Sequence, residues 1–192
     1  MKIYHLMGKA PYYTNCYILT DNKGTALLVD CSADMEKVKA ILENDRAQPA
    51  AILLTHGHRD HRQTLKEAIA QFDCPVYLGR EDARQFNLEN TIPYEDLGNL
   101  HFGEIRMHTF HTPGHTPGGF CLLGEGMLFS GDTLFAGTVG RTDFPGGNFE
   151  VLKESLARIV SKVPDETQVL PGHNHFSTMK LEKEQNPYLK RL

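Results

Sequence analysis

The segment Leu54-Thr55-His56-Gly57-His58-Arg59-Asp60-His61 places three imidazoles and one carboxylate within six residues. It continues the apolar run Ala51-Ile52-Leu53-Leu54, which predicts a buried strand with the polar groups emerging together at its carboxyl end. Burying so many ionisable groups side by side is costly unless they share a partner, and a metal ion is the usual one. A polar turn with satisfied histidines would explain one isolated histidine, but this density of side chains indicates a metal site. The tight H-x-H-x-D-H spacing can serve two adjacent ions, unlike the spacing of zinc fingers.

Three more segments place a histidine or an aspartate just after an apolar run, beside glycine or proline. They are His111-Thr112-Pro113-Gly114-His115-Thr116-Pro117-Gly118, Phe129-Ser130-Gly131-Asp132 and Pro171-Gly172-His173. Glycine and proline let the backbone turn tightly at the end of a strand. Each segment alone is compatible with an ordinary turn or cap, but in combination with the first cluster they point to one metal centre.

Composition and charge are those of an ordinary globular protein. The chain has 192 residues, of which 40% are hydrophobic, and a formal net charge of −4, so we expect a single domain spanning residues 1–192. The absence of basic runs argues against nucleic acid as a partner, and no apolar stretch reaches the roughly 18 residues of a membrane span. Four widely separated cysteines without a C-x-x-C motif indicate buried thiols in a reducing compartment. We therefore expect a cytoplasmic protein with no membrane or nucleic-acid partner.

The apolar pattern predicts a layered arrangement of sheets and helices. Short apolar runs predict strands at 17–19, 26–29, 51–54, 75–78 and 168–170, and short antiparallel strands between Gly98 and Asp132. Helical spacing predicts three amphipathic helices, with apolar faces marked by Met35, Val38, Ile41 and Leu42, by Leu65, Ile69 and Phe72, and by Phe149, Leu152, Leu156, Ile159 and Val163. A last polar helix is expected to run through Leu181 and to end before Pro187. The glycine-rich stretch from Thr133 to Asn148 is the one long irregular segment, and such loops are often functional.

In this order, T-H-x-H-x-D-H, T-P-G-H-T-P-G, S-G-D-T-L-F and P-G-H resemble the metallo-β-lactamase fold superfamily, and within it the small glyoxalase II-like hydrolases. The resemblance extends from Asn15-Cys16-Tyr17 to Glu184-Gln185-Asn186-Pro187. It implies an α/β fold, an αββα sandwich of two mixed sheets flanked by helices, with the metal site at one edge between the sheets.

The resemblance also implies a set of seven ligands shared by two divalent ions. The ligands of the first ion are His56, His58 and His115, those of the second are Asp60, His61 and His173, and Asp132 bridges both. All seven are nitrogen or oxygen donors, which suits Zn, Fe or Mn. Asp60 and Asp132 are the expected catalytic residues. Two divalent ions, two carboxylates and a bridging hydroxide leave a site charge of roughly +1, which attracts anions and stabilises an oxyanion.

The reaction expected of such a site is hydrolysis by a metal-bridging hydroxide, because coordination lowers the pKa of water from near 16 to about 7. No isolated acid near the motifs suggests a proton donor for the leaving group. An amine leaving group generally requires protonation, whereas a thiolate with a pKa of about 8 to 9 can leave unaided. The sequence therefore favours small anionic thioesters, such as hydroxyacylglutathione or a related acyl-thiol, as substrates.

Two residues outside the ligand set are candidates for substrate binding. Arg141 matches a position where glyoxalase II enzymes carry a basic residue that contacts glutathione, although Asp143 replaces the tyrosine expected two residues later; a simple loop pair with Asp143 is the alternative. His175 stands where the family usually has a small residue, and it is a hydrogen-bond donor to a ligand, a substrate contact or an exposed side chain. The chain ends nineteen residues after His173, so we expect it to lack the helical domain that supplies much of the glutathione site.

The alternative function is that of an oxidoreductase similar to the persulfide dioxygenases, which share this fold and bind one iron through the first-site residues. The Asp-Thr-Leu-Phe segment and Phe144-Pro145-Gly146-Gly147 resemble the hydrolases more closely. A nuclease is not expected, because such relatives carry a large inserted domain. A non-enzymatic metal-binding module is not expected either, because seven ligands exceed what structural support requires.

Overall fold

The first half of the chain forms a mixed six-stranded sheet in the computed structural model, which describes all residues from 1 to 192. The strands lie in the order β1 (Lys2–Met7), β2 (Asn15–Thr20), β3 (Thr25–Val29), β4 (Gln48–Leu53), β5 (Val76–Leu78) and β6 (Thr91–Pro93). The first three are antiparallel, and β3 to β6 are parallel. Parallel neighbours need crossover connections, which contain α1 (Met35–Asp45), the 3-10 turn η1 (Arg59–Arg62), α2 (Leu65–Phe72) and α3 (Arg80–Gln85).

Strand β2 shows why the predicted strands have no polar face. Cys16 and Ile18 pack with side chains of α1 and α2, whereas Tyr17 and Leu19 pack against the second sheet. Successive side chains of a strand point to opposite faces, so a strand covered on both sides is buried at every position, and the middle of β2, from Cys16 to Leu19, is apolar throughout. All six residues of β2 are accordingly buried.

The second half forms another mixed six-stranded sheet, with its own helical cover. Its strand order is β14 (Ser177–Thr178), β13 (Gln168–Pro171), β10 (Met127–Gly131), β9 (Phe120–Gly124), β8 (Ile105–His111) and β7 (Asn99–Phe102). The remaining elements are η2 (Tyr94–Asp96), the hairpin of β11 (Leu134–Phe135) and β12 (Thr138–Val139), α4 (Phe149–Lys162), α5 (Met179–Gln185) and η3 (Leu189–Arg191). Asn148 caps α4 by accepting hydrogen bonds from two backbone N–H groups.

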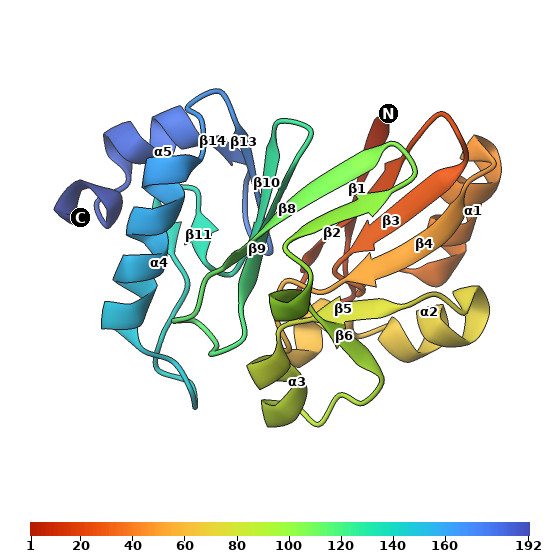
Figure 1. Cartoon of the computed structure of the whole chain (residues 1–192), viewed down its shortest axis with the longest axis horizontal. Helices are drawn as coiled ribbons and strands as arrows, with labels where there is room; N and C mark the ends of the chain where they lie inside the picture. Colours follow the sequence, from red (N-terminus) through yellow and green to blue (C-terminus); the bar gives the residue numbers. More distant parts are fainter.

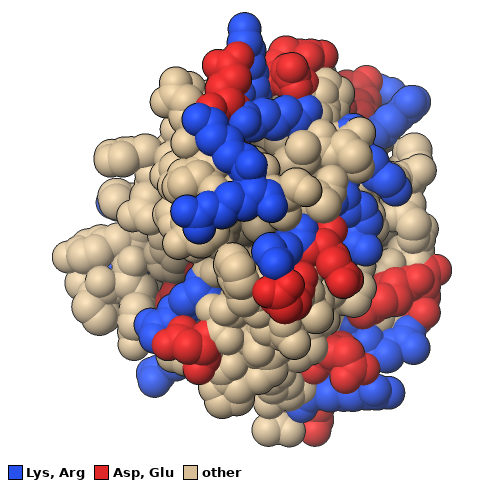
Figure 2. All heavy atoms as spheres, turned by 90° about the vertical axis from the view of Figure 1, so that its left-hand side faces the viewer, with Lys and Arg blue, Asp and Glu red and all other residues tan.

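The two sheets lie face to face, with α1 and α2 outside one and α4 and α5 outside the other (Figure 1). Three apolar clusters hold these layers together: one between the sheets, one under α1 and α2, and one under α4 and its neighbours. The predicted αββα sandwich is therefore confirmed. On the outer face that carries α4 and α5, positive and negative side chains are interspersed (Figure 2).

The structure departs from the sequence predictions in a few places. Helix α3, strands β6 and β14 and the β11–β12 hairpin were not predicted, and Ile69 and Phe149, expected on apolar helical faces, are exposed. All four cysteines are free, as expected, but Cys74 is only half-buried. None of the helices combines the length and apolar character that a membrane crossing requires.

Candidate metal centre

The four polar segments found in the sequence meet at the carboxyl ends of β4, β8, β10 and β13. His56, His58 and His115 form a first group, in which one ring nitrogen of each lies within 4.8 Å of the others. His58 Nδ1 lies 3.0 Å from His115 Nε2. The His56 ring stands nearly perpendicular to the other two, at 88° and 81°.

Asp60, His61 and His173 form a second group with the same spacing limit. The turn η1 carries Asp60 and His61, while His173 follows β13 in the other sheet. His173 Nε2 lies 3.0 Å from Asp60 Oδ2 and 3.3 Å from His61 Nε2. The second group therefore draws its ligands from both halves of the sandwich.

Asp132 lies between the two groups, at the end of β10. Its Oδ1 is 3.2 Å from His61 Nε2, and its Oδ2 is 3.5 Å from His115 Nε2 and 3.7 Å from His173 Nε2. The carboxylate of Asp132 thus lies close to a histidine of the first group and to two histidines of the second. All seven predicted ligand residues are brought together, and their binding to metal stays a prediction.

Two buried atoms of this cluster form no hydrogen bond, His56 Nε2 and Asp132 Oδ1, and only the second has an ionic neighbour, His61 Nε2 at 3.2 Å. An unsatisfied buried polar atom costs about 1–3 kcal/mol, so the lone pair of His56 Nε2 indicates that a further partner belongs there. His115 supplies a further sign, because its Nδ1 lies 2.7 Å from the carbonyl oxygen of Arg141. A carbonyl only accepts, so Nδ1 donates and leaves Nε2 of the neutral ring with a free lone pair. These nitrogen and oxygen atoms fit divalent cations.

Neighbouring residues of the cluster have opposite proton affinities. Burial and the charge of His61 hold the pKa of His56 well below its ordinary value, and burial with the nearby His115 lowers the pKa of His58 to about 4. Burial alone would also lower the pKa of His61, but the carboxylates of Asp132 and Asp30 outweigh it and raise that pKa well above its ordinary value. Burial would raise the pKa of Asp132, but the pair that it forms with His61 outweighs burial and holds this pKa far below its ordinary value.

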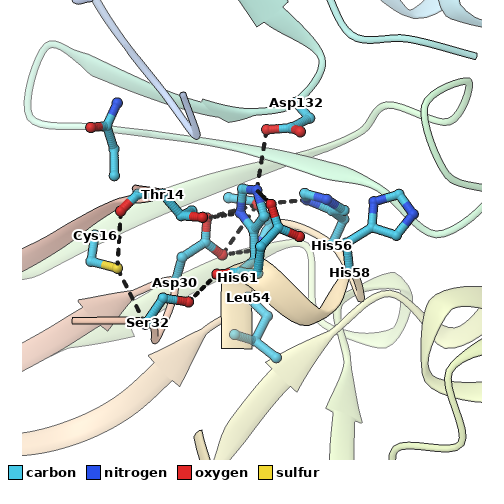
Figure 3. Close-up of polar contacts among 12 residues, drawn as sticks. Thr14, Cys16, Asp30, Ser32, Leu54, His56, His58, His61 and Asp132 are labelled. Atoms are coloured by element: carbon cyan, nitrogen blue, oxygen red, sulfur yellow. Dashed lines mark hydrogen bonds and ion pairs between the residues drawn. The ribbon is translucent and has the colours of Figure 1, made fainter. Parts of the chain in front are cut away.

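Asp30 fixes the orientation of His61 from behind (Figure 3). Its Oδ2 lies 2.8 Å from His61 Nδ1, and its Oδ1 accepts a hydrogen bond from the backbone N–H of Thr55 at 2.9 Å. A partner on Nδ1 leaves Nε2 directed at the centre, which is how ligand histidines are usually held. Asp30 directly follows the strand predicted at 26–29, but the sequence alone assigned it no role in the site.

Asp82 of α3 holds the segments that carry the first group in place, as Asp30 holds His61. Asp82 was not identified from the sequence. The carboxylate is fully buried and accepts hydrogen bonds from Gly57 N at 2.8 Å, Thr116 Oγ1 at 2.8 Å and Gly118 N at 2.6 Å. Gly57 lies between His56 and His58, and Thr116 follows His115, so Asp82 contacts both segments that carry the three predicted ligands of the first group. One side chain therefore joins the two loops that carry the first group.

Gly172 explains why a glycine precedes His173. A Cβ atom built there would overlap both Asp132 and His61. The backbone of the last ligand loop consequently passes directly behind the centre, which only glycine permits.

A cavity of about 650 Å³ opens over the centre. Arg141 lies on its wall with its guanidinium paired to Asp143 by two hydrogen bonds of 2.7 and 2.6 Å and placed 4.1 Å from the centre of the Phe144 ring. The pairing alternative considered for Arg141 is thus realised, although an exposed pair of this kind is weak and leaves the cation at the cavity wall. His175 is exposed and lines a neighbouring cavity instead. His5, His101, His108 and His111 lie outside the ligand groups.

Comparisons with known proteins agree with this architecture. The family model described as the metallo-beta-lactamase superfamily matches residues 10–173. A hydroxyacylglutathione hydrolase, GloC, from Haemophilus influenzae is 30% identical, over 93% of this chain and 93% of its own.

Two solved structures show the same similarity in three dimensions. The structure of TTHA1623 in a di-iron-bound form is 35% identical with a TM-score of 0.81, covering 96% of this chain and 99% of its own. The structure of ETHE1 from Myxococcus xanthus is 28% identical with a TM-score of 0.82, covering 97% and 84%.

Proposed function

The chain belongs to the metallo-beta-lactamase superfamily, and from that premise we propose that it is a thioester hydrolase that works with two divalent ions. The observation that carries the proposal is the pair of three-residue ligand groups with Asp132 between them. His56, His58 and His115 would hold one ion; Asp60, His61 and His173 would hold the other. Zinc, iron and manganese all suit this donor set, and the di-iron form of a similar protein is consistent with iron.

Bound divalent ions would lower the pKa of a water molecule towards neutrality and polarise the carbonyl of the substrate. The residues of the chain prepare the site for this chemistry. Asp30 and the Arg141 carbonyl fix the rings of His61 and His115, so no ring has to reorient during the reaction. Asp60 and Asp132 would offset the positive charge of the ions, and Asp60 is about one-fifth exposed at the cavity.

The lining of the cavity favours a thiolate leaving group. Apart from the proposed ligands, the cavity is lined by Tyr12, Arg59, Phe135, Thr138, Val139, Arg141, Phe144 and Asn174. This set includes no histidine, lysine, aspartate or glutamate, so no free side chain has an ordinary pKa near neutrality. A thiolate leaves without a proton donor, whereas an amine does not.

The test is a comparison of one acyl group attached through sulfur, oxygen and nitrogen, together with metal analysis of the purified protein. We expect about two ions per chain and a steep fall of kcat/KM from thioester to ester to amide. Faster cleavage of the amide than of the thioester would refute the thioesterase proposal.

The second candidate is the mononuclear iron dioxygenase acting on a persulfide. The observation that favours it is that the first group alone offers three ring nitrogens within 4.8 Å of one another, enough to hold a single iron. Oxygen uptake with glutathione persulfide, combined with one iron per chain, would select this candidate over the hydrolase.

A further inference from the structure

A second cavity, of about 460 Å³, lies beside the metal cavity and is lined by residues of the β1–β2 connection and of the loop after β13. The two cavities share Tyr12, His173 and Asn174 in their linings. His173 is a proposed ligand, so a molecule whose carbonyl lies at the metal centre can extend past it into this neighbouring space. We call this space the outer cavity.

The outer cavity gathers exposed apolar side chains. Met7, Tyr12, Tyr13 and Phe176 line it, and they are 60%, 51%, 55% and 47% exposed. Four large apolar side chains at one concave place are unusual on a protein surface and mark a binding site. Ligand sites typically combine apolar and aromatic side chains with polar groups that fix orientation, and the polar residues here are His5, Asn15, His173, Asn174 and His175.

The walls of the outer cavity are held in place by internal contacts. Asn15 accepts a hydrogen bond from His5 Nε2 at 2.8 Å, and its amide donates to the carbonyls of Pro171 at 3.0 Å and Asn174 at 3.1 Å. The Phe176 ring packs edge-on against His5, with 4.9 Å between the ring centres. Because the polar atoms of Asn15 are already paired, the side chains of Met7, Tyr12, Tyr13 and Phe176 remain as the apolar part of the cavity wall.

Charge separates the two cavities. No lysine, arginine, aspartate or glutamate lines the outer cavity, whereas Arg59, Arg141 and two carboxylates line the metal cavity. A charged group would find no ionic partner among the residues that line the outer cavity. The outer cavity therefore suits an uncharged group, and any anionic part of the same molecule would lie near Arg59.

We propose that the outer cavity binds an uncharged apolar or aromatic group of the substrate, attached on one side of the thioester that is cleaved at the metal centre. This inference rests on the proposed hydrolase function and narrows its substrate class. His175, on the same wall, would contact that group. The thiol half of glutathione, with two carboxylates and an ammonium group, does not match this cavity.

The experiment compares three thioesters: acetyl-N-acetylcysteamine, its 3-phenylpropanoyl analogue, and the acetyl thioester of 2-phenylethanethiol. The wild type should cleave at least one aromatic compound with a kcat/KM about tenfold above that of the small one. The selectivity ratio is the kcat/KM of the better aromatic compound divided by that of the small one. In Phe176→Ala and Tyr13→Ala this ratio should fall about tenfold. Ile69→Ala is the matched control, because Ile69 is a large apolar residue with a similar exposure, 42%, and lines neither cavity. Its ratio should match the wild type.

A higher kcat/KM for the 3-phenylpropanoyl compound would place the acyl half of the substrate in the outer cavity. A higher kcat/KM for the thioester of 2-phenylethanethiol would place the thiol half there. Either result supports the proposal. An equal ratio in wild type and Phe176→Ala, or an equal loss in Ile69→Ala, would overturn it. A thioether analogue of the 3-phenylpropanoyl compound, which cannot be hydrolysed, separates this proposal from the proposed function. If no thioester is cleaved, binding of the thioether is measured by calorimetry. A Kd that rises about tenfold in Phe176→Ala and in Tyr13→Ala would still support the proposed binding role of the outer cavity. Absence of such binding refutes it.

Discussion

Replacing Asp82 by alanine tests whether one buried carboxylate holds the first ligand group in place. Asp82 accepts hydrogen bonds from Gly57 N, Thr116 Oγ1 and Gly118 N. Alanine would leave all three donors buried without a partner, at about 1–3 kcal/mol each. The low end of this range gives a loss of about 3 kcal/mol. For a chain of this size it corresponds to a fall in Tm of about 6–12 °C.

Asp82→Asn should have a smaller effect, because its amide keeps one acceptor oxygen. Gly57 N and Thr116 Oγ1 share Oδ2, whereas Gly118 N uses Oδ1. An amide oxygen at the Oδ2 position keeps two of these bonds and turns an N–H towards Gly118 N. We therefore expect about one-third of the alanine effect, and a partial rescue of metal retention.

The assay is the release of metal to a chelator, measured beside Tm. Asp82→Ala should lose one ion at a lower chelator concentration than the wild type and keep the other, since only the first group is tied to Asp82. Asp21→Ala is the matched control. Like Asp82, Asp21 is a buried carboxylate that accepts three hydrogen bonds, here all from backbone N–H groups, but it lies at the β2–β3 turn. Equal metal release from both variants, after similar losses of Tm, would refute a positioning role for Asp82.

Four further predictions follow from the centre and its surroundings. His61→Ala or His173→Ala should empty the second metal site and leave the first largely occupied; two ions per chain in either variant, by metal analysis, would contradict the assignment. Asp132→Asn should lower thioester hydrolysis by several orders of magnitude and weaken metal retention, and near-normal turnover would make Asp132 a loop residue only. Burial would raise the pKa of Asp21, but three backbone N–H groups outweigh it and hold the pKa at about 2. Because this lies below the ordinary value of about 3.9, Asp21 stabilises the fold above about pH 4 and loses that effect as the pH falls towards 2. Asp21→Asn should therefore flatten the dependence of Tm on pH between about pH 4 and 2. An unchanged slope would contradict this. Arg141→Ala should raise KM for anionic thioesters more than it lowers kcat, and steady-state kinetics showing the reverse would exclude a remote anchor.

The sandwich and the cluster of ligand residues could be predicted because their signals are local. The apolar runs of β2, β3 and β4 are uniform, since both faces of the first sheet are buried. The ligand residues follow directly after strands, and the carboxyl ends of those strands meet at one edge. The motifs, and the family resemblance that they carry, were therefore enough to propose seven ligand positions, which the fold brings together.

The residues that hold the ligands in place could not be found in this way. Helix α3, with the sequence REDARQ, has only six residues and no apolar periodicity, so nothing local distinguishes Asp82 from its exposed neighbours. Its partners lie 25 to 36 residues further along or back in the chain. Asp30 and His61 are likewise 31 residues apart. Only the packed fold brings such groups into contact.

The proton affinities of the cluster give an independent reason for placing cations in it. The ring centres of His56 and His61 lie 4.0 Å apart. The pKa of His56 is nevertheless strongly lowered, whereas that of His61 is strongly raised. A proton on His61 compensates Asp30 and Asp132, but it also repels a second proton from His56, whose Nε2 then stays buried without a partner. Protons alone consequently cannot satisfy both the carboxylates and the histidine lone pairs. Divalent cations can, because each accepts several lone pairs at once while it offsets the negative charge of Asp132.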